Sequence, residues 1–327
     1  MSVSELFESF RQWSQTETGK KKDVSMADEP LPASETPVIA QATTDFGSRL
    51  AAPRPVQNAI RMVALDMDGT MLNPRESITP RVHRAVYETV KRGIQVVIAT
   101  ARPPRSVRFY HRALKLETPI VSHNGALVWD ERRQCVLRHA SLDHSLVRRV
   151  IAFARRRCPE VIPSVEIIDR LYSDHFGIVP MDSLPPGRSF SPDVIASMEA
   201  FLRVPVTRLF LHGKPSVIDE LNYLLPGRFH DRLNVIHSES RLLQIVAPDI
   251  TKASALGFLA DAYGFSSQQV MAIGDTANDL PMLQWAGMGV VMANAPEHVR
   301  NVVGNVVPSN AEDGVAVALE KYILNTD

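Results

Sequence analysis

Two aspartates separated by one residue follow an apolar run of strand-forming residues. Residues 60–70 read IRMVALDMDGT, so Asp66 and Asp68 end the apolar run and precede glycine and threonine. This pattern predicts a buried strand that stops at an acidic loop. In an open α/β sheet, chemistry lies at that end of the strands. One carboxylate of such a pair can attack a substrate or bind a metal while the other transfers protons.

Further polar residues stand at the ends of later predicted elements. Thr100 follows a second apolar run, and Asp275 and Asp279 follow another. Lys252 begins a predicted helix that Gly264 ends. Taken singly, Asp and Thr are common turn and N-cap residues, and a lysine at a helix start is usually solvated. Chance is a poor account of the whole set in this order and at these strand ends, so we expect one shared site.

The elements that must position these residues alternate between strand and helix. Thr79 and Pro80 fit the N-cap and first positions of a helix that Gly93 ends. Predicted strands cover residues 60–65, 94–99, 119–122, 270–273, 288–292 and 302–307, and predicted helices cover 79–92, 104–114, 252–263 and 312–324. This alternation implies right-handed crossovers and an α/β fold with a doubly wound parallel sheet.

Residues 127–246 break the alternation and predict an inserted α+β domain. Within them we expect a hairpin at 127–130 and 135–138, helices at 142–157 and 215–225, and strands at 161–168, 170–172, 206–211, 233–237 and 242–246. Residues 59–126 and 247–327 would then form the α/β core.

Residues 1–58 are predicted to be a disordered tail and linker. Residues 15–56 are rich in Lys, Glu, Ser, Thr, Pro and Ala, with few large apolar side chains, so they cannot bury enough surface to fold. Residues 2–14 have an amphipathic pattern that suits either a docking helix or a frayed end, and we favour the frayed end.

Composition narrows the class of protein further. The chain has 36 basic and 36 acidic side chains, so no overall positive field attracts nucleic acid. No apolar run approaches the ~18 residues of a membrane span. Cys135 and Cys158 lack the spacing of a metal or redox motif, which suits a reducing compartment. We expect a cytoplasmic protein, with a plastid as the alternative if the tail is an import segment.

The polar positions, in this order, resemble the four motifs of the haloacid dehalogenase (HAD) superfamily. Those motifs are an Asp-x-Asp-Gly-Thr loop, a Ser or Thr at a strand end, a Lys and a Gly-Asp-x-x-x-Asp loop, which stand here at 66–70, Thr100, Lys252 and 274–279. The likeness is closest to Cof-type phosphatases, through ATAR at 99–102, SHNGA at 122–126, GDTAND at 274–279 and NAEDGV at 310–315. It covers about residues 58–325 and implies an HAD-like core with a type-two cap at 127–246. Cof-type proteins usually have Gly where this chain has Ala101 and Ala253, which are also small.

The resemblance implies a role for each carboxylate. A phosphate monoester is doubly negative, so an attacking carboxylate needs a cation, and Mg²⁺ takes oxygen ligands. The carboxylates of Asp66 and Asp275 and the main-chain carbonyl of Asp68 would bind Mg²⁺. Asp66 would be the nucleophile that forms an aspartyl-phosphate, while Asp68 would protonate the leaving alcohol and then activate water.

Other residues would hold the phosphoryl group or support the metal site. The residues implied to contact the phosphoryl oxygens, through side chain or main chain, are Met67, Thr100, Ala101, Asn124 and Lys252. Asn278 and Asp279 would orient the metal ligands or position Lys252. Arg102 fits either a phosphate or sugar contact or a salt bridge to a core acid. His123 fits a substrate contact or, as we favour, a structural role.

The expected function is an Mg²⁺-dependent phosphatase for a small phosphomonoester, such as a sugar phosphate. The alternatives are a phosphomutase of the phosphomannomutase type and a non-catalytic phospholigand-binding protein. Sugar phosphates, flavin-pathway phosphates and nucleotides all remain open, because a cap rather than the core selects the substrate. The sequence does not indicate an oligomeric state.

Overall fold

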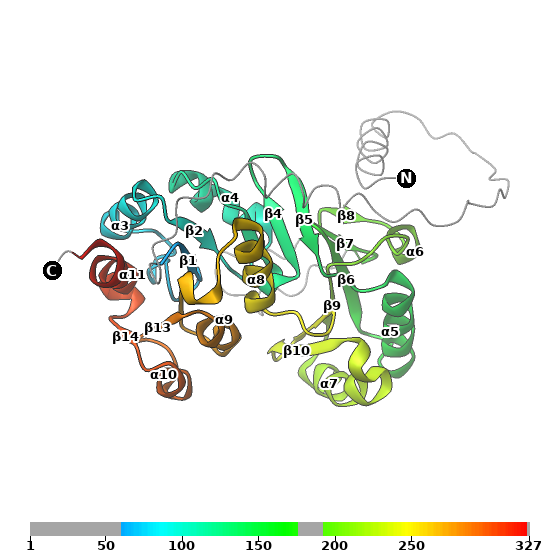
Figure 1. Ribbon diagram of the computed structural model, residues 1–327. Coiled ribbons are helices and arrows are strands. Elements are labelled where there is room, and N and C mark those ends of the chain that lie inside the picture. Colours follow the sequence, from blue (N-terminus) through cyan, green and yellow to red (C-terminus); the bar gives the residue numbers. More distant parts are fainter. Residues whose placement is uncertain (1–59, 176–191, 326–327) are drawn as a thin grey trace. The chain divides into compact units, whose positions relative to one another are not determined.

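The computed structural model describes residues 60–175 and 192–325 (Figure 1). The predicted tail at 1–58, with its amphipathic segment at 2–14, lies outside the described residues.

A five-stranded parallel sheet forms the centre of the core. Its strands, in the order β14-β13-β12-β1-β2, are Val306–Val307, Met288–Met292, Val270–Gly274, Met62–Leu65 and Gln95–Ile98. β1 lies between β12 and β2, and all four of its residues are buried. A parallel sheet with helices on both faces buries its strands in this way. The parallel doubly wound core predicted from the sequence is therefore confirmed (Figure 1).

The core helices begin and end largely where local signals place them. The helical segments are α3 Pro80–Lys91, α4 Pro104–Ala113, η1 His123–Gly125, α8 Lys252–Tyr263, η4 Ser267–Gln269, η5 Ala277–Asp279, α9 Leu280–Trp285, α10 Glu297–Val303, η6 Asn310–Glu312, α11 Gly314–Leu319 and η7 Glu320–Leu324. Thr79 caps α3 by accepting from the Val82 N–H at 3.2 Å. Gly264 ends α8 in the left-handed conformation, with φ of 70°. Both ends agree with the sequence prediction.

The predicted strand at 302–307 is wrong over most of its length. Residues 297–303 form α10, and only Val306 and Val307 are extended. Val299 and Val303 are four residues apart and pack together beside Val291, which is the spacing of one helix face. A run of β-branched residues suits a strand locally, but this packing favours the helix.

The strand at Ile120–Ser122, β3, does not extend the parallel sheet as predicted. It pairs antiparallel with β4, Leu127–Asp130, which pairs with β5, Cys135–His139. A single parallel bridge between Ala99 and Val121 joins β3 to the chain after β2. The tight turn at η1 returns the chain beside β3, so the hairpin of β4 and β5 pairs with β3. The domain boundaries remain a prediction.

The cap is built on a six-stranded sheet in the order β10-β11-β9-β6-β7-β8. Its strands are β6 Ile162–Ile167, β7 Arg170–Ser173, β8 Val194–Ile195, β9 Arg208–His212, β10 Asn234–Glu239 and β11 Leu242–Val246, and its helices are α5 His144–Arg157, α6 Met198–Phe201, α7 Pro215–Phe229 and η3 His230–Arg232. Leu209 and Leu211 of β9 belong to an apolar cluster with residues of α5 and α7. Arg208 alternates with them, and its Nη1 donates to the Ala101 carbonyl of the core at 3.3 Å.

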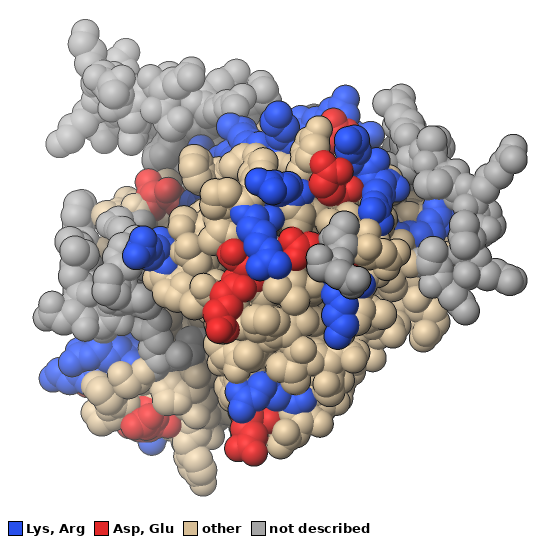
Figure 2. Space-filling model, turned by 90° about the vertical axis from the view of Figure 1, so that its left-hand side faces the viewer, with Lys and Arg blue, Asp and Glu red and all other residues tan. Residues whose placement is uncertain are grey.

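The charged side chains on the surface are consistent with the equal numbers of acidic and basic residues. Figure 2 shows acidic and basic side chains close together on one face of the molecule. Across residues 60–175 and 192–325, no helix is long and apolar enough to cross a membrane.

Candidate active site

Asp66 lies at the carboxyl end of β1 and is held by a buried lysine. Its side chain is only 7% exposed, and its Oδ1 accepts from Lys252 Nζ at 2.5 Å. Lys252 is the first residue of α8, which Thr251 caps through the Ser254 N–H. The strand end and the helix start therefore bring together two residues that are 186 positions apart.

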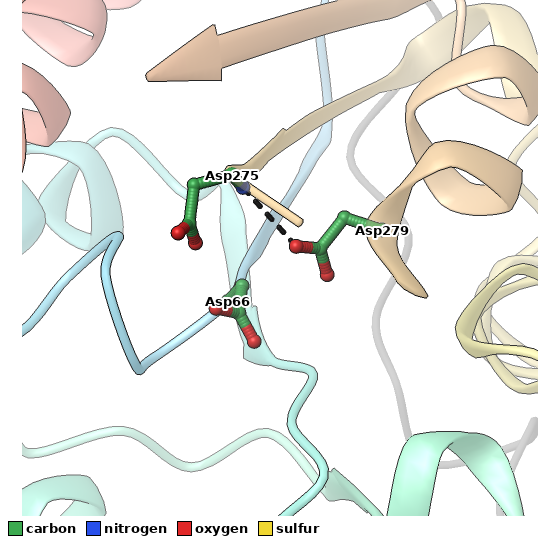
Figure 3. Close-up of side chains that lie close together, drawn as sticks. All are labelled: Asp66, Asp275 and Asp279. Carbon is green, nitrogen blue, oxygen red and sulfur yellow. Dashed lines mark hydrogen bonds between the residues drawn. The ribbon is translucent and has the colours of Figure 1, made fainter. Parts of the chain in front are cut away.

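Three carboxylates face one another at this end of the sheet (Figure 3). Asp66 comes from the end of β1, and Asp275 and Asp279 come from the loop after β12. One oxygen atom from each carboxylate lies within 4.8 Å of the others, and all three residues are buried. These are hard oxygen donors of the kind that Mg²⁺ binds.

Asp275 is oriented by groups on the loop that follows Asp66. Its Oδ1 accepts from Thr70 Oγ1 at 2.7 Å. Gly69 packs against the same carboxylate with φ of +78°, and a Cβ atom there would lie 2.2 Å from Asp275 Oδ2. Glycine is therefore required at this position by both its conformation and the close approach.

Asp279 is already occupied by hydrogen-bond donors. Its Oδ1 accepts from Lys252 Nζ at 2.6 Å, and its Oδ2 accepts from the N–H groups of Asp275 and Thr276 at 3.1 and 2.8 Å and from Thr276 Oγ1 at 2.9 Å. These contacts fix the lysine and the loop, which favours a positioning role over metal ligation. Asn278 is exposed, and among the described residues its side chain makes no hydrogen bond to Asp66 or Asp275.

The electrostatics of the site reflect an excess of negative charge. Burial raises the pKa of Asp66, and Lys252 opposes that effect. Burial also raises the pKa of Asp275, to about 6. Burial disfavours the charge on Lys252, but Asp66 and Asp279 outweigh it and raise its pKa. One lysine thus faces three carboxylates, and a divalent cation would relieve the repulsion that remains.

Asp68 lies in a different environment from the other three aspartates. Arg102 donates to it in a bidentate pair, with Nε 2.9 Å from Oδ2 and Nη2 2.5 Å from Oδ1. Its side chain is 38% exposed. Of the two alternatives for Arg102, the structure therefore has the salt bridge to an acid.

The predicted phosphoryl-binding loops meet beside Lys252. Thr100 is fully buried, and its Oγ1 accepts from the Arg102 N–H at 3.1 Å. The Asn124 N–H donates to the Thr100 carbonyl at 3.0 Å, and Asn124 has φ of 56°. A Cβ atom at Gly125 would lie 2.2 Å from the Thr251 carbonyl, so this loop packs directly against the start of α8.

The main chain around Asp66 contributes to the same region. Met67 is fully buried, and its carbonyl accepts from the Leu72 N–H at 2.9 Å. The main-chain carbonyl of Ala101 accepts from Arg208 of the cap at 3.3 Å. Met67 and Ala101 therefore shape the loops rather than present reactive side chains.

His123 has the structural role that we favoured. Its Nε2 donates to the Ile168 carbonyl of the cap at 2.9 Å. Burial lowers the pKa of His123 to about 3, so the ring is neutral near pH 7.

Sequence reasoning missed Asn294, which contacts Asp275 and the loop at Gly69. Asn294 Nδ2 donates to the Gly69 carbonyl at 2.8 Å and to Asp275 Oδ2 at 3.4 Å, and its Oδ1 accepts from the Asn310 N–H at 3.0 Å. Asn294 follows the end of β13. The rule that located Asp66 and Thr100, a polar residue after a buried strand, would also have found it.

Comparisons with known proteins agree with this fold. A family model described as haloacid dehalogenase-like hydrolase matches residues 63–319. The chain is 28% identical over 268 residues to the Bacillus subtilis protein named 5-amino-6-(5-phospho-D-ribitylamino)uracil phosphatase YcsE, covering 81% of this chain and 96% of that protein. It is 30% identical over 298 residues to the Arabidopsis thaliana protein named Endoribonuclease YBEY, chloroplastic, covering 84% of this chain and 48% of that protein. The crystal structure of TM0651 from Thermotoga maritima superposes with a TM-score of 0.72 at 27% identity, covering 80% of this chain and 97% of that one.

The parallel core, the inserted cap and the carboxylates at the strand ends are together typical of a hydrolase whose active site is built from aspartates. The chain belongs to the haloacid dehalogenase-like hydrolase family and, within it, to the Cof-type phosphoric monoester hydrolases. The resemblance drawn from the sequence motifs is thereby confirmed.

Proposed function

We propose that the protein is an Mg²⁺-dependent phosphatase that cleaves a small phosphomonoester through an aspartyl-phosphate on Asp66. The observation that carries the proposal is the separation of two carboxylates into different environments. Asp66 is buried against Lys252, whereas Asp68 is partly exposed and paired with Arg102. One carboxylate is thus placed to attack and the other to exchange protons.

The oxygen-rich end of the sheet fits Mg²⁺. The carboxylates of Asp66 and Asp275 and the main-chain carbonyl of Asp68 would hold the ion, and Asp279 and Asn294 would orient the ligands and Lys252. When bound, Mg²⁺ would offset the negative charge of the phosphate and of the attacking carboxylate.

Each step then has a residue of this chain to perform it. Asp66 attacks the phosphorus, and the ester oxygen leaves as Asp68 gives it a proton. Asp68, now a carboxylate, takes a proton from the water that hydrolyses the aspartyl-phosphate. The ion pair with Arg102 stabilises that carboxylate form. Lys252 and Thr100 hold the phosphoryl oxygens as charge develops.

The substrate we propose is a small metabolite phosphate ester, and a phosphorylated sugar alcohol is the first candidate. Support comes from YcsE, whose name specifies a phosphoribityl substrate and which matches 81% of this chain. A panel of sugar, ribityl and nucleotide monophosphates, assayed with Mg²⁺ for released phosphate, tests this choice.

The decisive variant is Asp66→Asn, a change of nearly equal volume. It should abolish hydrolysis of p-nitrophenyl phosphate while the circular dichroism spectrum stays that of the parent. Hydrolysis at the parental rate by Asp66→Asn would rule out the mechanism. A hexose 1-phosphate supplied with a bisphosphate activator distinguishes a phosphomutase, which would yield the isomer instead of free phosphate.

For the compartment, we propose the cytoplasm, with a plastid as the alternative. The name of the Arabidopsis relative, which includes the word chloroplastic, supports the alternative. A fluorescent protein fused to the C-terminus of the full chain would distinguish the two compartments.

A further inference from the structure

No side chain at the start of helix α4 accepts a hydrogen bond from the first turn of the helix. Its N-cap residue is Pro103, which makes no side-chain hydrogen bond to the helix, and its first residue is Pro104. Because neither proline has an N–H, the first main-chain donor after Arg102 belongs to Arg105. The N–H groups of a first helical turn need an acceptor from outside the helix.

The cap domain supplies the acceptor that the helix lacks. Asp169 lies in the turn between β6 and β7, and its Oδ1 accepts from the Arg105 N–H at 2.8 Å. The same carboxylate pairs with the guanidinium groups of Arg105 at 3.4 Å and Arg108 at 3.3 Å. A carboxylate at a helix N-terminus also interacts favourably with the helix dipole.

The turn that presents Asp169 is strained and is attached to a second core loop. Ile168 has φ of 59°, which a β-branched residue adopts rarely. Its carbonyl accepts from His123 Nε2 at 2.9 Å. The turn therefore contacts His123, next to Asn124, as well as the start of α4, which follows the loop of Thr100 and Ala101.

A buried ion cluster beside the turn strengthens the same attachment. Glu166 of β6, whose side chain is 1% exposed, pairs with Arg105 Nη1 of the core and Arg208 Nε of the cap, each at 2.6 Å. Arg208 in turn donates to the Ala101 carbonyl at 3.3 Å. The cap therefore holds two main-chain atoms, Ala101 O and Arg105 N, on either side of Arg102.

The segment held in this way carries two residues of the proposed mechanism. Thr100 is bonded to the Arg102 N–H, and the Arg102 side chain holds Asp68. We propose that Asp169 is a positioning residue for phosphoryl transfer. Asp169 belongs to the cap domain but caps helix α4 of the core. It therefore keeps Thr100 and Arg102 in their working orientation only while the turn at 168–169 is docked against α4. This inference rests on the proposed function.

Asp169→Ala tests the inference, with Asp143→Ala as a matched control. Asp143 is also an aspartate N-cap, accepting from the Leu146 N–H at 3.1 Å, but the helix it caps is α5, inside the cap. Each variant loses one helix cap, and Asp169→Ala also loses the ion pairs with Arg105 and Arg108, so both proteins are compared while they are folded. Below both melting temperatures, Asp169→Ala should lower kcat/KM for an alkyl phosphate by about 10- to 100-fold, and Asp143→Ala should leave it at the parental value.

Asp169→Asn separates the main-chain cap from the ion pairs. The amide keeps an oxygen for the Arg105 N–H and loses the charge that faces Arg108. It should therefore retain kcat/KM within about threefold of the parent, since asparagine caps helices as well as aspartate does. If Asp169→Asn were as impaired as Asp169→Ala, or if Asp169→Ala behaved as Asp143→Ala does, the proposal would be overturned.

A binding measurement keeps the inference independent of turnover. Calorimetric titration of inorganic phosphate in the presence of Mg²⁺ should show about tenfold weaker binding by Asp169→Ala than by the parent and Asp143→Ala. If the parent binds phosphate but hydrolyses no ester, the proposed function fails while this comparison still decides the role of Asp169. Equal phosphate affinity in all three proteins would contradict it.

Discussion

Arg102 holds both carboxylate oxygens of Asp68, with Nε 2.9 Å from Oδ2 and Nη2 2.5 Å from Oδ1. A bidentate pair of this kind fixes the direction of the carboxylate as well as its charge. Asp66, two residues earlier, is held instead by Lys252. Each aspartate is therefore paired with a different cation, which suits the two carboxylates to different steps of one reaction.

The first prediction concerns Arg102→Met, which removes this pair. We expect kcat to fall by about 10- to 100-fold for an alkyl phosphate, because Asp68 loses the orientation needed for proton transfer. The loss should be smaller for p-nitrophenyl phosphate, whose leaving group departs without a proton. Steady-state assays of both substrates measure the difference.

Arg81→Met is the control for Arg102→Met. Arg81 pairs with Glu320 at 2.6 Å, and its side chain is 50% exposed. Its replacement should leave kcat for both substrates unchanged, as expected for a surface ion pair. An equal loss for the two substrates in Arg102→Met would show that Arg102 does not act through Asp68.

The second prediction concerns Gly69→Ala. The added Cβ would lie 2.2 Å from Asp275 Oδ2, so the Asp275 carboxylate must move away from its position beside Asp66 and Asp279. The Mg²⁺ concentration for half-maximal activity should rise at least about tenfold, because a misplaced ligand weakens the site. A titration of the phosphatase rate with Mg²⁺ measures it.

Gly93→Ala is a matched control for Gly69→Ala. Gly93 has nearly the same conformation, with φ of +80°, but a Cβ atom there meets nothing within 4 Å. Both variants carry the backbone strain of a positive φ, about 1 kcal/mol. Gly93→Ala should lose that stability and keep the parental Mg²⁺ requirement. A raised requirement in Gly93→Ala would assign the effect to general destabilisation.

The sequence predicted the core of the site because parallel strands end at one edge of a sheet. Asp66, Thr100 and Asp275 each follow a buried strand, so their convergence needed only the topology. The helix limits at Thr79 and Gly264 followed from local chemistry, since an N-cap and a left-handed glycine require no distant partner.

Long-range partners could not be predicted in the same way. The sequence contains many arginines and carboxylates, and only the fold selects Arg102 for Asp68 or Asp169 for the start of α4. The helix at Glu297–Val303 was missed because its valines suit a strand locally, and its packing became visible only in the structure. Local propensity is a weak guide where tertiary contacts decide.

The third prediction concerns Lys252→Met, which leaves Asp66 and Asp279 buried without their shared cation. Removing one partner of a buried ion pair costs about 3 kcal/mol or more. We expect a loss of this size in the free energy of unfolding, measured with urea in the absence of Mg²⁺. Adding Asp279→Asn to Lys252→Met removes one unpaired charge and should recover part of the loss.

Lys91→Met is the surface control for Lys252→Met. Lys91 lies 3.9 Å from Glu88, and its side chain is 67% exposed, so its replacement should change stability by less than about 0.5 kcal/mol. If Lys252→Met were no less stable than Lys91→Met, the buried lysine would not be neutralising the carboxylates.

The fourth prediction concerns competition between protons and Mg²⁺ at Asp275. Burial raises the pKa of Asp275 to about 6, and only the carboxylate form is a ligand. Burial raises the pKa of Asp66, the other carboxylate ligand, to about 8, so Mg²⁺ affinity should fall about tenfold for each pH unit between pH 8 and pH 6 and more steeply below pH 6, where Asp275 also gains a proton. Calorimetric titration of Mg²⁺ between about pH 5 and pH 9 measures the curve.

Thr70→Val shows whether Asp275 is the titrating ligand. Thr70 Oγ1 donates to Asp275 Oδ1 and so favours the carboxylate, which means that its loss must raise the pKa further. The curve of Mg²⁺ affinity should move to higher pH. Thr89→Val, the same change at a buried threonine whose hydroxyl donates to the Ala85 carbonyl, should leave the curve in place. A curve that Thr70→Val does not move would assign the titration to another group, because Thr70 bonds to Asp275 alone among the three carboxylates.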